Sequence, residues 1–160
     1  MKTKITYIIA LFLVNIGMLH AQEKLFNKLA DNDNVSVVYI SKALLNMIPE
    51  FESAGGTDIG QLSDKLEQIE IYTCEGDTKT INVMRSEMES LTKSKTYESL
   101  MTIKEKKQSV NFLGYKQNDK FKDLIMYVNE DQSCTIIRIK GSFTSSDIKK
   151  VVKPSTDKTK

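Results

Sequence analysis

The chain has 160 residues, of which 28% are charged, and it carries a formal net charge of +2, one histidine and no tryptophan. Lys2 and Lys4 account for that charge, because the other 21 basic residues are balanced by 21 acidic ones. The histidine, His20, lies in an N-terminal segment that resembles an export sequence. If that segment is removed, the chain cannot form a Ser-His-Asp or Cys-His catalytic site or a histidine-ligated metal centre.

Residues 1–21 have the pattern of a cleavable secretory signal peptide. Two lysines precede an uncharged, mostly apolar run over residues 5–19, and the small residue Ala21 ends the segment. The run is shorter than the about 20 apolar residues that cross a bilayer, so cleavage between Ala21 and Gln22 is favoured over a membrane anchor. We therefore predict a periplasmic or secreted protein with no stable membrane insertion after cleavage.

The first elements beyond this segment are a helix, a strand and a second helix. Residues 23–30 place apolar side chains on one helical stripe, and the four turn-forming residues 31–34 end it. Residues 35–40 are β-branched or aromatic at nearly every position, which predicts a central strand buried on both faces. Ser41 can cap a following helix that continues to Ile48.

The middle of the chain contains a loop, a strand and the clearest amphipathic helix. Residues 50–60 hold three glycines and several acidic residues, which favours a surface loop. Residues 67–74 alternate in character and predict a strand with its isoleucines on a buried face. Apolar residues then recur at spacings of three and four over residues 81–91, which predicts a helix capped by Asp77 or Thr78.

The C-terminal part changes from a helical period to a period of two residues. Short polar turns separate four such segments, which favours an antiparallel meander. Thr144 or Ser145 can cap a last helix, and residues 153–160 form a polar tail that we expect to be disordered. The sequence thus predicts a single α+β domain over residues 22–152, with a mainly antiparallel sheet of about six strands and helices packed on one face. The meander strands are expected at Tyr97–Lys104, Ser109–Lys116, Phe121–Asn129 and Cys134–Lys140.

Cys74 and Cys134 are the only two cysteines and form a candidate disulfide. One ends a predicted strand and the other begins another, so antiparallel pairing of these strands would bring them together. Two buried thiols are the alternative, and both interpretations remain open.

Other candidate chemistry is sparse. Three acidic pairs could hold carboxylates for acid–base work on a glycan, but solvated surfaces explain them better. Lysines concentrate around the meander, where a neutral exported protein more plausibly uses them for solubility than for binding nucleic acid. We expect no metal and no cofactor, because no ligand cluster or phosphate loop is present. The acidic pairs are Glu67 with Glu70, Glu87 with Glu89, and Glu130 with Asp131.

Four segments stand out together: residues 25–30, 37–44, 97–101 and 136–143. They resemble a family of exported bacterial proteins, found chiefly in Bacteroidetes, that is catalogued as domain of unknown function 4252. The resemblance implies a signal peptide, one compact domain and a Gram-negative envelope setting, and it supplies no activity. None of the segments is a catalytic motif.

Three functions remain open at the level of the sequence. We favour a non-enzymatic binding or regulatory module that contacts another envelope protein. The lack of catalytic motifs in the sequence is easier to reconcile with protein binding than with catalysis. A carboxylate-dependent hydrolase of envelope glycans, assisted by Tyr39, Tyr72 or Tyr97, is the first alternative. An accessory of an envelope stress or signalling system is the second.

Overall fold

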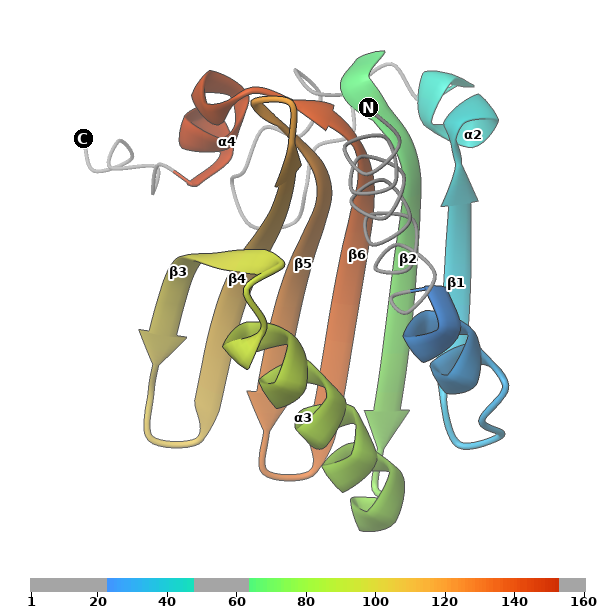
Figure 1. Ribbon diagram of the computed structural model, residues 1–160. Coiled ribbons are helices and arrows are strands. Elements are labelled where there is room, and N and C mark those ends of the chain that lie inside the picture. Colours follow the sequence, from blue (N-terminus) through green and yellow to red (C-terminus); the bar gives the residue numbers. More distant parts are fainter. Residues whose placement is uncertain (1–22, 48–63, 153–160) are drawn as a thin grey trace, which may run out of the picture.

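The computed structural model describes residues 23–47 and 64–152 of the chain. These residues form a six-stranded antiparallel sheet with the strand order β1-β2-β6-β5-β4-β3, accompanied by helices (Figure 1). The predicted α+β fold is confirmed. The strands are β1 (Ser36–Ser41), β2 (Leu66–Glu75), β3 (Tyr97–Lys104), β4 (Gln108–Gln117), β5 (Lys120–Glu130) and β6 (Ser133–Phe143); the helices are residues 23–30, α2 (Lys42–Met47), α3 (Thr78–Lys93) and α4 (Ser145–Val152).

Several predictions concern residues outside this description. The signal peptide with its junction at Ala21 and Gln22, the loop over residues 50–60 and the polar tail over residues 153–160 all fall there.

The C-terminal meander matches its prediction, with every strand boundary within three residues of the expected one. A two-residue turn joins β4 to β5 through Asn118 and Asp119, whose φ angles are 50° and 60°. Two consecutive positive φ angles are characteristic of a type I′ hairpin turn, which suits the right-handed twist of the flanking strands and tolerates Asn and Asp. Turn chemistry therefore sets the register of these strands.

Side chains from the two faces of the sheet form two separate apolar clusters. The first lies under residues 23–30 and α3, and we call this side of the sheet the covered face (Figure 1). The second lies on the opposite side, which we call the second face. Alternation along each strand produces this division, so that Leu113 and Ile125 belong to the first cluster while their neighbours Phe112 and Leu124 belong to the second.

Helix α3 packs on the covered face as its periodicity predicts. The Asp77 carboxylate accepts a hydrogen bond from the backbone N–H of Thr80 at 3.1 Å, which confirms Asp77 as the N-cap. Ile81, Met84 and Met88 are buried against the strands. The helix thus seals the half of the covered face nearest the β5–β6 turn (Figure 1).

The two short helices contribute to the other side of the sheet. Leu45 of α2 and Ile148 of α4 are buried in the second cluster, at the end of the sheet where β6 finishes (Figure 1). Thr144 caps α4, since its hydroxyl accepts from the Asp147 N–H at 3.2 Å while the Asp147 carboxylate accepts from the Thr144 N–H at 2.8 Å. The expected packing of helices on one face therefore holds for residues 23–30 and α3, and the structure adds a partial second layer.

Two strands differ from their predicted environments. The strand predicted as central, β1, lies at an edge, and its Val38 and Tyr39 are 51% and 54% exposed. Its β-branched and aromatic composition favours extended backbone without implying burial on both faces. In β2 the residues expected on the solvent side, Glu70 and Tyr72, are buried beneath the helices, because both faces of this strand are covered in part.

Candidate functional site

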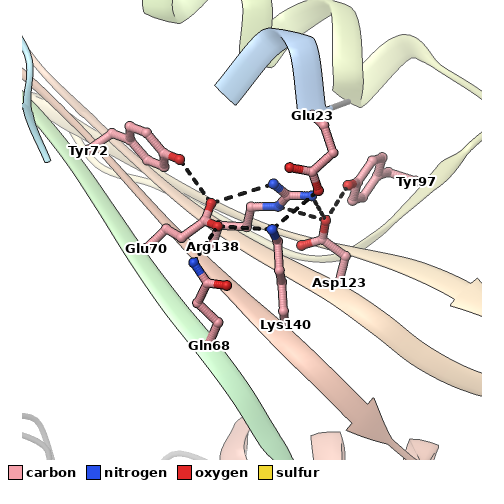
Figure 2. A network of polar contacts seen from close by, with 8 residues as sticks. All are labelled: Glu23, Gln68, Glu70, Tyr72, Tyr97, Asp123, Arg138 and Lys140. Atoms are coloured by element: carbon pink, nitrogen blue, oxygen red, sulfur yellow. Dashed lines mark hydrogen bonds and ion pairs between the residues drawn. The ribbon is translucent and has the colours of Figure 1, made fainter. Parts of the chain in front are cut away.

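The covered face contains a group of polar side chains around a buried arginine, which we call the Arg138 cluster (Figure 2). It draws on four strands and on the helix over residues 23–30, so residues 115 positions apart in sequence meet there. Its members are Glu23, Gln68, Glu70, Tyr72, Tyr97, Asp123, Arg138 and Lys140.

Strand register brings the core of this cluster together. In the pairing of β2 with β6, Glu70 lies opposite Arg138 and Gln68 opposite Lys140. In the pairing of β5 with β6, Asp123 lies opposite Lys140. Residues directly opposite on antiparallel strands point to the same face, so acidic and basic side chains from three neighbouring strands converge.

Arg138 is the centre of the cluster and is only 3% exposed. Its Nε donates to Asp123 Oδ2 at 2.8 Å, and its terminal nitrogens reach Glu23 Oε1 at 3.0 Å and Glu70 Oε2 at 3.5 Å. The guanidinium also lies over the ring of Phe26, 4.2 Å from its centroid. Burial of the guanidinium opposes its charge, but the carboxylates of Asp123 and Glu23 outweigh this effect and raise the pKa of Arg138.

Glu70 and Lys140 form the second half of the cluster. Lys140 Nζ lies 2.9 Å from Glu70 Oε1 and 3.2 Å from Glu23 Oε1. The same Glu70 carboxylate accepts hydrogen bonds from the Tyr72 hydroxyl at 2.9 Å and from the Gln68 amide at 3.0 Å. Burial and the neighbouring Glu70 charge raise the pKa of Tyr72, so this tyrosine acts as a hydrogen-bond donor at neutral pH.

Asp123 is the least satisfied member of the cluster. Its Oδ2 accepts from both Arg138 and the Tyr97 hydroxyl, the latter at 3.0 Å, whereas its Oδ1 is buried without a hydrogen-bond partner among the described residues. Desolvation raises the pKa of Asp123 despite the nearby Arg138. Three carboxyl groups, those of Glu23, Glu70 and Asp123, surround the two cations of Arg138 and Lys140 here.

This geometry limits what the cluster can do chemically. Glu70 and Asp123 lie on either side of Arg138 and are 4% and 5% exposed, so neither side chain is open to a substrate (Figure 2). Both carboxylates are engaged by cations, and a paired carboxylate is a poor general base. The arrangement joins the helix over residues 23–30 to the sheet and fixes the register of β2, β5 and β6.

The sequence did not single out this set of residues. Glu70 was named as part of an acidic pair with Glu67, which is exposed, and Asp123 was not named as a site residue. Of the three tyrosines named as assistants of a hydrolase, Tyr72 and Tyr97 lie in the cluster, whereas Tyr39 lies on the edge strand β1 and is 54% exposed. The residue types gave no indication, because contact between Asp123 and Arg138 depends on the register of β5 against β6. The alternation in β2, which places Glu70 and Tyr72 on one face, was the only usable signal.

The other predicted acidic pairs are separate from the cluster. Glu87 and Glu89 lie on α3, where they form ion pairs with Lys28 and Lys93. Glu130 and Asp131 line an open hollow of about 580 Å³ at the turn end of the sheet, together with other hairpin residues. This hollow mixes both signs of charge, and its remaining lining residues are Glu105, Lys106, Lys107, Gln108 and Gln132.

Cys74 and Cys134 lie directly opposite one another in the pairing of β2 with β6, as the argument from strand ends requires. Both are free thiols in the structure, and both are buried. Burial raises the pKa of Cys134 to about 12, so its thiolate is scarce at neutral pH. The disulfide itself stays a prediction.

The second face presents a different candidate surface. One row of directly opposed residues crosses all six strands, and every member of it is apolar. The next row toward the β5–β6 turn is composed of smaller apolar and hydroxyl side chains. The large-residue row is Val38, Ile71, Ile137, Met126, Phe112 and Met101; the small-residue row is Ser36, Thr73, Thr135, Val128, Val110 and Ile103.

The residues of these two rows are partly or well exposed, with the exception of Phe112, which is buried. Ile136 on the covered face is fully buried, whereas its neighbour Ile137 is partly exposed, and Ile103 at the β3 edge is 42% exposed. Leu45 of α2 and Ile148 of α4 are the described helical residues buried in the second cluster, and they pack around the strand ends beyond the rows. We call the surface formed by the two rows the open face.

None of the helices that the structure describes is long and apolar enough to span a membrane. Within residues 23–47 and 64–152, no group of three or more histidine, cysteine or acidic side chains has a metal-binding arrangement.

The fold and the two surfaces define a small α+β protein built on one antiparallel sheet. The chain matches the family described as "Domain of unknown function (DUF4252)" over residues 26–151, and it belongs to that family. No curated protein and no solved structure matches it. The resemblance noted from the sequence is thereby confirmed as family membership.

Proposed function

We propose that this is an exported envelope protein that acts by binding another protein through the open face, without catalytic turnover. The observation that carries the proposal is the absence of charge from all twelve positions of the two rows, in a chain that is 28% charged. A partly exposed apolar surface of this extent with a polar rim marks a protein interaction site. The rim at the turn end includes Glu75, Ser133, Glu130 and Gln108.

The Arg138 cluster supports binding over catalysis. A carboxylate hydrolase needs two acids that face a substrate across an open cleft. Glu70 and Asp123 do converge, but Arg138 fills the space between them and all three side chains are buried. The cluster is better suited to holding the scaffold rigid behind the open face.

One observation favours the hydrolase as a second candidate. Asp123 combines a raised pKa with an oxygen that has no hydrogen-bond partner among residues 23–47 and 64–152, two properties that accompany catalytic acids. Hydrolysis of cell-wall glycan or soluble glycosides by the purified protein, lost in Asp123→Asn, would support this candidate. Absence of hydrolysis by the wild-type protein would remove it.

Export is tested by the N-terminus of the protein recovered from fractionated cells. We expect chains that begin at Gln22 in the periplasmic or secreted fraction, since residues 1–21 have the signal-peptide pattern. Material that retains Met1 and stays in the cytosol would contradict export.

Binding is tested by a photo-reactive amino acid placed at Met126, in the centre of the open face. In living cells it should cross-link to a second polypeptide, which is then identified by mass spectrometry. The matched control is the same amino acid at Val83, an exposed apolar position on α3 on the other side of the sheet. No product at Met126, or equal products at both positions, would contradict a binding role for the open face.

A further inference from the structure

We infer that the partner of the open face is a second copy of this chain, stacked sheet on sheet in a two-fold dimer. This inference rests on the proposed function, because it names the partner of the same surface. It follows from the arrangement of the two rows, from the area they present and from the charge of the chain.

The two rows are complementary to each other in size. A two-fold axis lying in the interface, perpendicular to the strands, would reverse the strand direction and place the large-residue row of each copy on the small-residue row of the other. Each strand would then face its own counterpart, with Ile137 over Thr135 and Met126 over Val128. Large side chains facing small ones let two sheets interdigitate at the usual separation of about 10 Å.

The same axis also removes a steric obstacle. Leu45 of α2 and Ile148 of α4 are buried around the strand ends beyond the large-residue row, so both helices lie toward one end of the sheet (Figure 1). Reversal of the strand direction sends these helices to opposite ends of the dimer. The alternative axis, parallel to the strands, would bring the helices of both copies to the same end.

The area is sufficient for a reversible dimer. Six strands about 4.8 Å apart and two rows about 6.7 Å apart along the strands give about 500 Å² on each copy once the rims are included. Two such surfaces bury about 1,000 Å², the size at which specific interfaces begin. The dimer should therefore dissociate on dilution.

Charge does not oppose this association. The two rows carry no ionisable side chain, and the chain beyond Lys2 and Lys4 has equal numbers of basic and acidic residues. Two copies therefore meet without net repulsion. A strongly charged partner would gain nothing from an uncharged surface, whereas an identical uncharged surface matches it.

The test measures the mass of the purified protein over a range of concentrations by sedimentation velocity, with variants of the open face. The wild-type protein should shift from monomer to dimer as its concentration rises. Met126→Lys and Ile137→Lys should each raise the dimer dissociation constant by about 100-fold, because each buries an uncompensated charge. Val83→Lys, which adds the same charge on α3, should leave it unchanged.

A second measurement uses the wild-type protein, so it does not depend on whether a variant folds. Hydroxyl-radical oxidation of Met101 and Met126 on the open face should decrease as the protein concentration rises. Met47, which is 76% exposed on α2, should be oxidised equally at all concentrations.

The outcomes separate this inference from the proposed function. A wild-type protein that stays monomeric, or a dimer that survives both lysine substitutions, would overturn the inference. A monomer that cross-links at Met126 to a different protein would keep the binding function and replace the partner. A monomer whose Met101 and Met126 are protected only by phospholipid vesicles would overturn both.

Discussion

The two faces of the sheet use opposite chemistry at equivalent positions. On the covered face, Arg138 is buried among carboxylates and beneath an aromatic ring. On the second face, the adjacent Ile137 lies in a row that is apolar from one edge of the sheet to the other. The comparison teaches that the covered face places a few paired charges inside the protein, whereas the second face leaves apolar side chains partly exposed, and an unusual feature of this kind points to a role.

The contrast between buried ion pairs on the covered face and partly exposed apolar side chains on the second face has a physical basis. A buried ion pair contributes little net stability, but it penalises every register in which its partners do not meet. An exposed apolar row costs free energy in contact with water, and association recovers it. The covered face thus helps to specify a single strand register, and the open face is suited to contact with a partner.

Among the substitutions that test this difference between the two faces, we expect Arg138→Ala to have the largest effect on stability. Arg138→Ala leaves the carboxylates of Glu70 and Asp123 without their shared cation, and we expect it to lower the free energy of unfolding by about 3–5 kcal/mol. Urea unfolding followed by circular dichroism measures the change. Addition of Asp123→Asn should recover part of the loss, because it removes one uncompensated charge.

The control for this prediction is Lys149→Ala, which removes an exposed lysine of α4 and should change the stability little. If Arg138→Ala unfolded at the same urea concentration as the control, the cluster would have no structural role.

Two neighbouring isoleucines of β6 sharpen the comparison within a single strand. Ile136→Ala empties a fully buried site on the covered face and should cost about 3 kcal/mol. Ile137→Ala removes the same atoms from the partly exposed row and should cost about 1 kcal/mol in dilute solution. Thermal unfolding of both variants at low protein concentration gives the difference, and equal costs would show that the second face is as well packed as the first.

The cap of α4 gives a smaller effect with a defined pH dependence. Hydrogen bonds from Lys65 and Thr144 hold the pKa of Asp147 well below its usual range. A carboxyl with a lowered folded-state pKa stabilises the fold above its unfolded pKa of about 3.9, and this contribution is lost as the pH falls through the folded-state value.

Asp147→Ala should therefore cost about 1–2 kcal/mol at pH 7, with the difference from the wild type shrinking below about pH 4. Urea unfolding at pH 7, 5 and 3 measures this change. A difference that stayed constant down to pH 3 would contradict the assignment.

The last prediction concerns whether Cys74 and Cys134 are reduced or joined by a disulfide, and its readout is thiol reactivity. If Cys74 and Cys134 are reduced, burial and the raised pKa of Cys134 should make both resist alkylation in the native protein and react on denaturation. If they are bridged, denaturation alone should not permit alkylation, and a reductant should be needed. Mass spectrometry of the protein purified from cells distinguishes the two states.

The sequence predicted the fold well where local chemistry decides structure. The four meander strands and the α3 cap at Asp77 depend on alternation, turn residues and a single capping side chain, which are all visible in one chain. The position of β1 was predicted wrongly, because its composition reports extended backbone while its place at the edge depends on the pairing of β2 with β6.

The candidate sites were predicted poorly for the same reason. The Arg138 cluster joins residues from across the chain, and both rows of the open face become visible only when six strands are placed in register. The opposition of Cys74 and Cys134 was the exception, since each lies at a strand end that turn chemistry defines.

The strand order has a consequence for how the chain reaches its folded form. Because β2 pairs with β6, the last strand to be synthesised, β2 has no strand partner except β1 until nearly the whole chain has emerged. Hairpins of the meander can form locally within microseconds, but closure of the sheet requires contacts between residues more than fifty positions apart. Such a topology delays completion of the structure, and under the proposed export this delay would keep the chain extended while it crosses the membrane.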